Sequence, residues 1–333
     1  MSLLRAVRRF GMARLLLLAG LSAEGMAGGL LTVKSDNDAY VGGEDGHYTN
    51  GLELSWAFQP GPLHWSRRLV EALPAWAADD LAGVAYRASH QIYTPADIHD
   101  SRLVADDRPY AGVALGGVSL FSERRHVAFR QVRSLSLDVG VVGPASGAES
   151  LQREFHRLLG VNVPSGWEHQ LDHEPVLNLA YRSAWTRAWP LGRQRLELGP
   201  VAGLALGNLY TYAAAGVGVR FGNNLARSAG IPVMAPTSGG RVTFQRGQGF
   251  GWHLFLSLEG RYMAHNLLLD GNTFTSSHSV ARKPWVGDVL TGFALSRGRW
   301  QLAYSQAWRS DEFKGQEGHH RFGTISLSRW FSP

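Results

Sequence analysis

Apolar and polar residues alternate along much of the chain. One run places Leu135, Leu137 and Val139 at every second position, with Ser136 and Asp138 between them. Successive side chains of an extended strand point to opposite faces, so this pattern predicts strands with one apolar and one polar face. The runs last about ten residues or more, the length of a tilted strand that crosses a membrane. A transmembrane β-barrel is therefore favoured over the alternative, a soluble β-sandwich.

Twelve such segments can be assigned. Their residue ranges are 30–37, 48–58, 87–94, 110–122, 127–141, 175–189, 194–206, 209–221, 251–263, 284–296, 299–309 and 319–331. An even number of strands suits a closed bacterial barrel with both chain ends on the periplasmic side. We therefore predict an all-β fold, a twelve-stranded antiparallel transmembrane β-barrel with a short extracellular helix. The last segment resembles the C-terminal strand that the outer-membrane assembly machinery binds during biogenesis.

Connection lengths give the barrel an orientation. The short turns should be periplasmic and the long connections extracellular. We expect turns at 123–126, 190–193 and 296–298, and extracellular connections at 38–47, 95–109, 142–174, 264–283 and 310–318. Two segments, 59–86 and 222–250, are exceptions, because they are long and yet fall on the periplasmic side. Leu69, Leu73 and Trp76 recur at helical spacing in the first, and Ala148 to Leu159 predicts a helix in the 142–174 connection.

The N-terminal residues have the order of a secretory signal peptide. Basic residues from Arg5 to Arg14 precede an apolar run from Leu15 to Leu21, and small residues follow up to Ala27. The apolar run is shorter than the roughly 20 residues of a membrane-spanning helix. The uncharged stretch 198–219 is longer, but glycines and a proline interrupt it, and we expect two strands there. We predict a signal peptide over residues 1–27 and a single barrel domain over 28–333.

Composition agrees with an exported barrel. The chain has no cysteine, 40 glycines and 11 tryptophans, and 18% of its residues are charged. The absence of cysteine excludes disulfides and thiolate metal sites. The formal charge is +6 and most basic residues are arginine, whose planar fork grips phosphate at two points. Because an exported protein does not meet nucleic acid, we expect a phosphorylated lipid surface as its partner.

Polar residues gather at the predicted extracellular rim. They are Asn37, Asp38, His47, Tyr48, Thr49, Asn50, Asp106, Asp107, Arg108, Tyr110, Gln152, Glu154, His156, Glu168, His169 and His173. Gln152 and His156 are four residues apart and share one face of the predicted helix. Histidine is the usual general base near neutral pH, although a rim histidine can equally bond a loop carbonyl. The oxygens of Asp38 and Thr49 suit calcium, although Asn-Asp pairs are also common in turns.

Two common catalytic motifs are missing. The sequence contains no G-x-S-x-G, so a serine nucleophile elbow has no support. It also contains no H-E-x-x-H, and His169 and His173 lie in a predicted loop with Gln-Leu-Asp between them. Zinc is therefore not expected.

Several motifs resemble one known family, the outer-membrane lipid A 3'-O-deacylases. They are SDNDAY at 35–40, YTNGLELSW at 48–56, QIYTP at 91–95, DRPYAG at 107–112, GPASGAESLQREFH at 143–156, WEHQL at 167–171 and HNLLLDGN at 265–272. The motifs occur in the family's order, and the match runs from about residue 30 to the end. The resemblance implies a twelve-stranded barrel in the outer membrane, with a calcium-dependent site at the rim that faces the outer leaflet. Its substrate would be lipid A of lipopolysaccharide, which would lose the ester-linked 3' acyloxyacyl chain.

The resemblance also implies roles for individual residues. His156 matches the family's general base and Gln152 its helical neighbour, while Asn37, Asp38 and Thr49 match catalytic positions that would also hold the metal. Our hypothesis for the chemistry is that His156 activates a water molecule that attacks the acyl carbonyl.

The same resemblance implies a substrate-binding region. Arg108 would lie near a substrate phosphate, with Asp107 and Tyr110 beside it. Asp107 stands where the family can show a further basic residue, which puts the substrate's position in question. Two alternatives stay open: a calcium-dependent outer-membrane phospholipase and a non-catalytic porin-like barrel.

Overall fold

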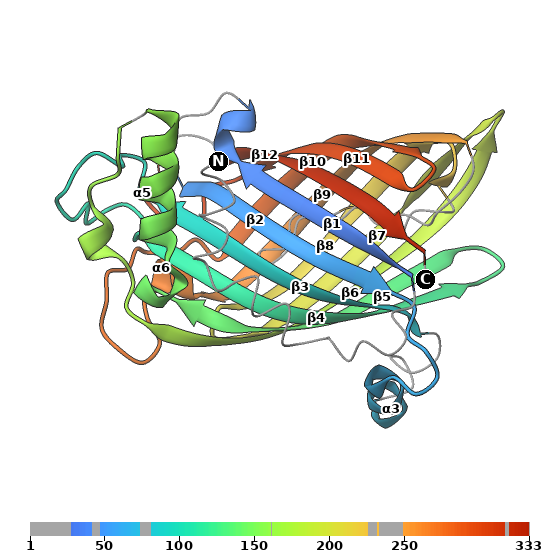
Figure 1. The fold of residues 1–333 in the computed structure, drawn as a ribbon, viewed down its shortest axis with the longest axis horizontal. Coiled ribbons are helices and arrows are strands. Elements are labelled where there is room, and N and C mark those ends of the chain that lie inside the picture. Colours follow the sequence, from blue (N-terminus) through green and yellow to red (C-terminus); the bar gives the residue numbers. More distant parts are fainter. Residues whose placement is uncertain are drawn as a thin grey trace.

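The protein forms a closed antiparallel β-barrel (Figure 1). The structure is a computed structural model that describes residues 28–41, 47–73, 81–160, 162–225, 232, 249–316 and 320–332. Each strand pairs with its neighbours in sequence, and β1 pairs with β12 to close the barrel. The predicted fold class is confirmed. The predicted signal peptide lies outside the described residues and stays a prediction.

Twelve strands make up the described part of the wall. Their bounds are β1 Gly29–Asn37, β2 His47–Phe58, β3 Leu81–Thr94, β4 Ala111–Arg125, β5 Arg130–Val142, β6 Glu174–Leu191, β7 Gln194–Gly207, β8 Tyr210–Gly222, β9 Phe250–Asn266, β10 Trp285–Arg297, β11 Trp300–Arg309 and β12 His320–Phe331. Helices are confined to the connections. They are α3 Trp65–Ala72, α5 Ala148–Leu159 and α6 Leu267–Asp270, with the 3-10 turns η1 Asp38–Val41, η2 Pro144–Ser146 and η3 Trp167–His169. None of these helices is long and apolar enough to cross a membrane.

Every predicted strand overlaps an observed one, but several bounds were wrong. β3 begins at Leu81 instead of residue 87, and β4 continues to Arg125, so the turn to β5 lies at 126–129 instead of 123–126. Glu123 to Arg125 still pair with β5, because the hydrogen-bond ladder needs only the backbone. Alternation of apolar and polar residues predicts only the part of a strand whose outer face must be apolar, so strand ends beyond that part are missed.

The helix expected in segment 59–86 is present. α3 begins after His64, whose side chain accepts a hydrogen bond from the Ser66 backbone N–H, and it ends at Leu73. Trp76 and most of segment 222–250 lie outside the described residues. The helix expected at 148–159 is observed with those bounds as α5.

The barrel wall has an apolar outside and a polar inside. Ion pairs join strands that are not neighbours, Arg87 of β3 with Asp138 of β5 and Arg182 of β6 with Glu259 of β9, so these side chains lie in the lumen. Residues of the opposite parity, such as Leu137 and Leu256, are exposed on the outside. The alternating sequence therefore places its charges inside the barrel and its aliphatic side chains toward lipid.

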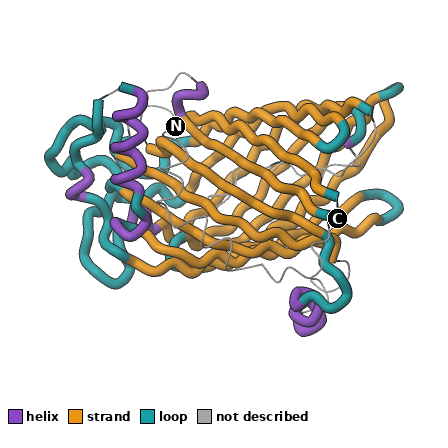
Figure 2. The backbone as a smooth tube through the Cα atoms, in the orientation of Figure 1, coloured by secondary structure: helices purple, strands orange, loops and turns teal. Residues whose placement is uncertain are grey.

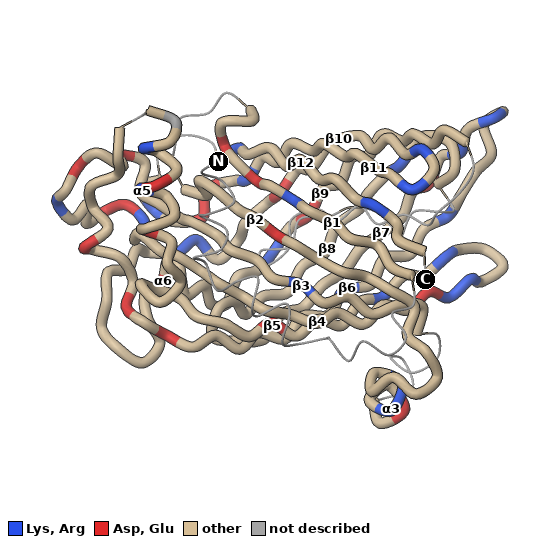
Figure 3. Tube along the Cα trace, in the orientation of Figure 1, with Lys and Arg blue, Asp and Glu red and all other residues tan. Residues whose placement is uncertain are grey.

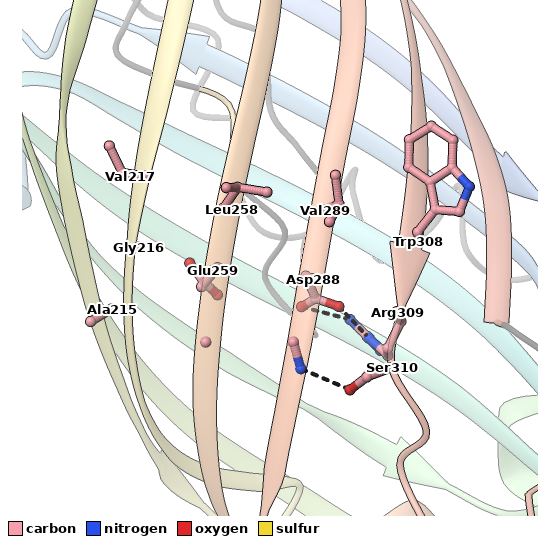
Figure 4. Close-up of a pocket in the computed structure, with 12 residues that line it drawn as sticks. Ala215, Gly216, Val217, Leu258, Glu259, Asp288, Val289, Trp308, Arg309 and Ser310 are labelled. Atoms are coloured by element: carbon pink, nitrogen blue, oxygen red, sulfur yellow. Dashed lines mark hydrogen bonds and ion pairs between the residues drawn. The ribbon is translucent and has the colours of Figure 1, made fainter.

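Figure 4 shows part of the wall formed by β8 to β11. Leu258 and Trp308 line a hollow there together with the lumen residues Glu259, Asp288 and Arg309. Arg309 Nε donates to Asp288 Oδ1 over 2.8 Å, which ties β11 to β10 inside the barrel.

The two ends of the barrel differ. α5, α6 and the long connections gather at one end, while the short turns, α3 and the paired ends of β1 and β12 lie at the other (Figures 1 and 2). Long extracellular loops and short periplasmic turns are the rule for outer-membrane barrels, so the end with α5 is the extracellular one.

Candidate active site

Helix α5 lies against the outer face of the barrel at its extracellular end. The Tyr93 hydroxyl contacts the Tyr210 hydroxyl of β8 across the lumen at 3.3 Å, so the neighbour of Tyr93 in sequence, Ile92, faces outward. Ile92 is buried in a cluster with Ala148 of α5, Tyr110 and Trp167. The helix is therefore docked on the side of the wall that faces the membrane (Figure 1).

A glycine allows this close approach. Gly112 pairs with Ile92, and a Cβ at this position would collide with the Ser146 side chain and with Ala148. Any larger residue at position 112 would move the start of α5 away from the wall.

His156 makes a short hydrogen bond to the loop that follows α5. Its Nδ1 lies 2.6 Å from the carbonyl oxygen of Asn162, and the side chain is 6% exposed. A carbonyl oxygen only accepts, so Nδ1 donates its proton to it, and in the neutral form of the ring the lone pair is then on Nε2. This is the tautomer that a general base requires, with Asn162 as its orienting partner. Sequence reasoning missed Asn162, because any backbone carbonyl can fill this role.

Gln152 is held in a similar way. Its Oε1 accepts a hydrogen bond of 2.8 Å from the indole Nε1 of Trp167, which fixes the orientation of the amide. The Nε2 group is buried and has no hydrogen-bond partner in the described part of the chain. A buried amide donor without an acceptor costs free energy, so it is a candidate donor for a substrate oxygen. Trp167 belongs to the WEHQL motif, but sequence reasoning gave it no role.

Asn37 and Thr49 meet where β1 and β2 end. Asn37 Nδ2 donates to the backbone carbonyl of Thr49 at 3.0 Å. Thr49 is the extra residue of a bulge in β2, and its hydroxyl lies 2.8 Å from the hydroxyl of Thr94. Thr94 has the outward parity of Ile92. The structure thus brings Asn37 and Thr49 together on the outer face, the face that α5 covers one strand further on.

The neighbouring Asp38 is 2% exposed. Its Oδ1 and the Oδ1 of Asn37 each accept a hydrogen bond of 2.8 Å from the Ala39 backbone N–H. In the described residues no group of three or more His, Cys, Asp or Glu side chains could hold a metal. The donors here are instead one carboxylate with amide, hydroxyl and carbonyl oxygens. Calcium accepts such all-oxygen sets, so the donor chemistry fits the predicted ion.

The predicted substrate residue Arg108 lies elsewhere, in the mouth of the lumen. It is 1% exposed, and its guanidinium carbon is 4.8 Å from the ring centre of Tyr93. Its Nη1 is 3.5 Å from the Glu312 carboxylate. Burial alone would raise the pKa of the Glu312 carboxyl. The pKa is nevertheless held well below its ordinary value by the charge of Arg309, a hydrogen bond with His320 and the charge of Arg108. Arg108 is therefore separated from His156 by the barrel wall.

Asp107 and Tyr110 hold the extracellular loops. Asp107 accepts hydrogen bonds from two backbone N–H groups, that of Ala96 at 2.7 Å and that of Arg108 at 2.6 Å. The Tyr110 hydroxyl donates to the Ile98 carbonyl at 3.2 Å, and its ring contacts Trp167. Burial raises the pKa of the Tyr110 hydroxyl, and nearby carboxylates add to the effect. Tyr110 thereby supports Trp167, the partner of Gln152.

His90 is a buried histidine that sequence reasoning missed. It faces outward on β3, and its Nε2 lies 3.1 Å from the carbonyl oxygen of Ser146, next to α5. The sequence around His90 does not predict that its side chain is buried, because the helix that covers it, α5, comes much later in the sequence.

Two large apolar side chains are exposed on the free face of α5, beside the ion pair of Glu154 and Arg157. Phe155 and Leu158 are 49% and 62% exposed, on either side of the buried His156. Large exposed apolar side chains at the membrane boundary suit contact with lipid. The candidate base thus lies between the barrel wall and a surface that a lipid substrate can reach.

Comparison with known proteins gives this arrangement a family. The family model described as "Outer membrane protein LpxR" matches residues 11–331. The chain belongs to the LpxR family. Its place is therefore the outer membrane, in agreement with the predicted localisation. Comparison with curated proteins gave no match.

Among the solved structures compared with this chain, an LpxR structure shares its fold. LpxR from Salmonella typhimurium superposes with a TM-score of 0.76 at 19% identity, over 91% of this chain and 100% of that one. The β domain of the Bordetella autotransporter BrkA gives a TM-score of 0.46 at 10% identity, over 92% and 100% of the two chains. The KdgM porin gives 0.35 at 8% identity, over 91% and 99%.

Proposed function

We propose that this LpxR-family protein is a calcium-dependent esterase that removes the 3'-linked acyloxyacyl chain of lipid A in the outer leaflet. The observation that carries the proposal is the fixed tautomer of His156, set by its bond to the Asn162 carbonyl, on the membrane side of the wall. The exposed Phe155 and Leu158 favour a lipid substrate over a soluble one.

The mechanism begins with His156. Nε2 takes a proton from a water molecule, and the hydroxide attacks the acyl carbonyl carbon to form a tetrahedral oxyanion. The buried Nε2–H groups of Gln152 donate to this oxyanion, a contribution that is commonly about 10²–10³-fold in rate. The intermediate then expels the sugar oxygen, which recovers the proton from the imidazolium. No covalent acyl-enzyme forms on this route.

The calcium ion would be held by oxygens of Asn37, Asp38 and Thr49. When bound, it supplies positive charge that stabilises negative charge on a substrate oxygen. The hydrogen bond between Asn37 and Thr49 already fixes the spacing of β1 and β2 at this point, which prepares the donors.

The porin-like alternative has less support than the enzyme. Ion pairs such as Arg87–Asp138, which lies over β4, and Arg182–Glu259, which spans β7 and β8, occupy the lumen side of the wall, whereas an open channel would need that space for solvent. The phospholipase alternative requires a strand-borne serine and histidine, whereas His156 lies on a helix outside the wall.

The substrate class can be tested with purified protein and two substrates. We expect loss of one acyloxyacyl unit from lipid A in calcium-containing detergent solution, and no fatty acid release from phosphatidylethanolamine vesicles. Mass spectrometry of the intact protein during turnover should show no acyl adduct. Release from the phospholipid alone would support the phospholipase, and a trapped acyl adduct would contradict activation of water by His156.

A further inference from the structure

A group of exposed arginines lies at the end of the barrel opposite the candidate active site. In Figure 3 blue segments of the tube, which mark Lys and Arg, gather at the periplasmic end beyond the label C, while red and blue segments are mixed around α5. We define the arginine collar as six exposed residues at the periplasmic end: Arg187, Arg193, Arg195, Arg297, Arg299 and Arg329. The sequence analysis expected the basic residues to bind a phosphorylated lipid. If the collar has this role, the lipid must lie at the periplasmic end.

The extracellular end exposes charges of both signs in its described residues, with Arg102, Arg157, Lys314 and Arg321 as its basic members. Asp97, Asp106, Glu154, Glu168 and Asp172 are exposed on its loops. Attraction of an anionic lipid A molecule does not account for the collar, because lipid A would meet the extracellular end.

Two collar residues lie on aromatic rings. The guanidinium carbon of Arg329 is 4.8 Å from the ring centre of Phe331 and 5.0 Å from that of Trp300, and the corresponding distance from Arg187 to Trp189 is 5.4 Å. Aromatic side chains at the end of an outward apolar band mark the level of the lipid headgroups. These cations are therefore held at the depth where phospholipid phosphates lie.

The collar is divided between two parts of the barrel. Arg187 and Arg195 lie on β6 and β7, whereas Arg297 and Arg329 lie on β10 and β12, and β8 and β9 separate the two groups. A single acidic protein would have to reach both groups through the headgroup layer. Several small anionic ligands spread around the barrel fit this arrangement better.

We propose that the arginine collar binds the phosphate groups of anionic phospholipids in the periplasmic leaflet of the outer membrane. Guanidinium groups match phosphate oxygens at two points, and basic residues at a membrane surface attract anionic lipids. This interaction anchors the barrel at a fixed depth and orientation and does not depend on ester hydrolysis.

Native mass spectrometry of the purified full chain tests the proposal. The protein in neutral detergent is titrated with phosphatidylglycerol or with phosphatidylethanolamine, and retained lipid adducts are counted. The collar variant combines Arg193→Gln, Arg297→Gln and Arg299→Gln. A matched control removes three exposed charges from the extracellular end by Arg102→Gln, Lys314→Gln and Arg321→Gln.

We expect wild type and control to prefer phosphatidylglycerol. The collar variant should lose at least tenfold in that preference, because each basic residue near an anionic surface contributes about fivefold. Arg329→Lys keeps the charge but loses the planar fork, and it should weaken binding less than Arg329→Gln. Equal binding of the two lipids to wild type, or equal losses in collar variant and control, would overturn the proposal. Heat-dependent gel mobility confirms that each variant is folded.

Discussion

Two hydrogen bonds define the chemistry of single residues at this site. The Asn162 carbonyl decides which nitrogen of His156 is basic, and the Trp167 indole decides which end of the Gln152 amide is free to donate. Neither partner ionises, so neither hydrogen bond depends on the titration of its partner group.

Gln152→Glu separates the donor role from the packing role. Glutamate keeps an oxygen for the Trp167 N–H but replaces the buried amide donor by a second oxygen. We expect kcat on lipid A to fall by about 10²–10³-fold with KM changed little. An unchanged kcat would show that Gln152 only supports the helix. Steady-state kinetics at saturating calcium measure the difference.

The residues on α5 were more predictable than those in loops. The four-residue spacing of Gln152 and His156 fixes their common face in any helix. Arg108 lies three residues before β4, where no periodicity shows whether its side chain enters the lumen or stays outside. The family resemblance implied a substrate contact for Arg108, and the structure shows an ion pair with Glu312. Its predicted substrate role is not tested by this geometry.

At the scale of elements, the site depends on how α5 meets the barrel. The helix bounds were predicted correctly because glycines at 147 and 160 frame an amphipathic segment, and both adopt positive φ. Its docking on the outer face was not predictable, because contacts between α5 and β3 join residues far apart in sequence. Alternation of apolar and polar residues likewise predicted that each strand exists. It did not predict where β3 and β4 end on the periplasmic side.

Gly112→Val tests the docking of α5. The new side chain would collide with Ser146 and Ala148, lift the helix and separate His156 from the wall, so activity should fall at least tenfold while the barrel stays folded. Gly116→Ala on the same strand is the control, because a Cβ there meets nothing closer than 4.0 Å. Faster proteolysis of the 142–174 connection in Gly112→Val alone would confirm the cause. Equal activity of both variants would contradict it.

At the scale of the whole molecule, ion pairs inside the barrel connect its wall to the extracellular loops. Arg261 and Arg309 both contact Asp288, and Arg309 also contacts Glu312 on the loop before β12, at 3.2 Å. Glu312 in turn lies 3.5 Å from Arg108. Buried pairs are costly to break because the remaining charge loses its partner. The network therefore stabilises the mouth of the barrel.

Glu312→Gln should destabilise the protein by about 3 kcal/mol at pH 7. Asp311→Asn removes the neighbouring, partly exposed pair with Lys283 and should cost less than about 1 kcal/mol. Because the fold lowers the pKa of Glu312, its contribution is fully present above the unfolded pKa of about 4.3 and is lost as pH falls further. Urea unfolding at pH 7 and pH 3 should show the difference between wild type and Glu312→Gln shrinking at pH 3. A constant difference would contradict the assigned charge.

The most direct test of the account is mass spectrometry of lipid A from cells that express wild type, His156→Ala or the control His169→Ala, with and without calcium chelation. His169 lies on the same extracellular connection, and its Nε2 lies 3.1 Å from the carbonyl oxygen of Ser101. The account predicts loss of one 3' acyloxyacyl unit in wild type and control with calcium present. It predicts intact lipid A with His156→Ala or after chelation. Unchanged lipid A in every sample, with the barrel correctly inserted, would contradict the deacylase proposal.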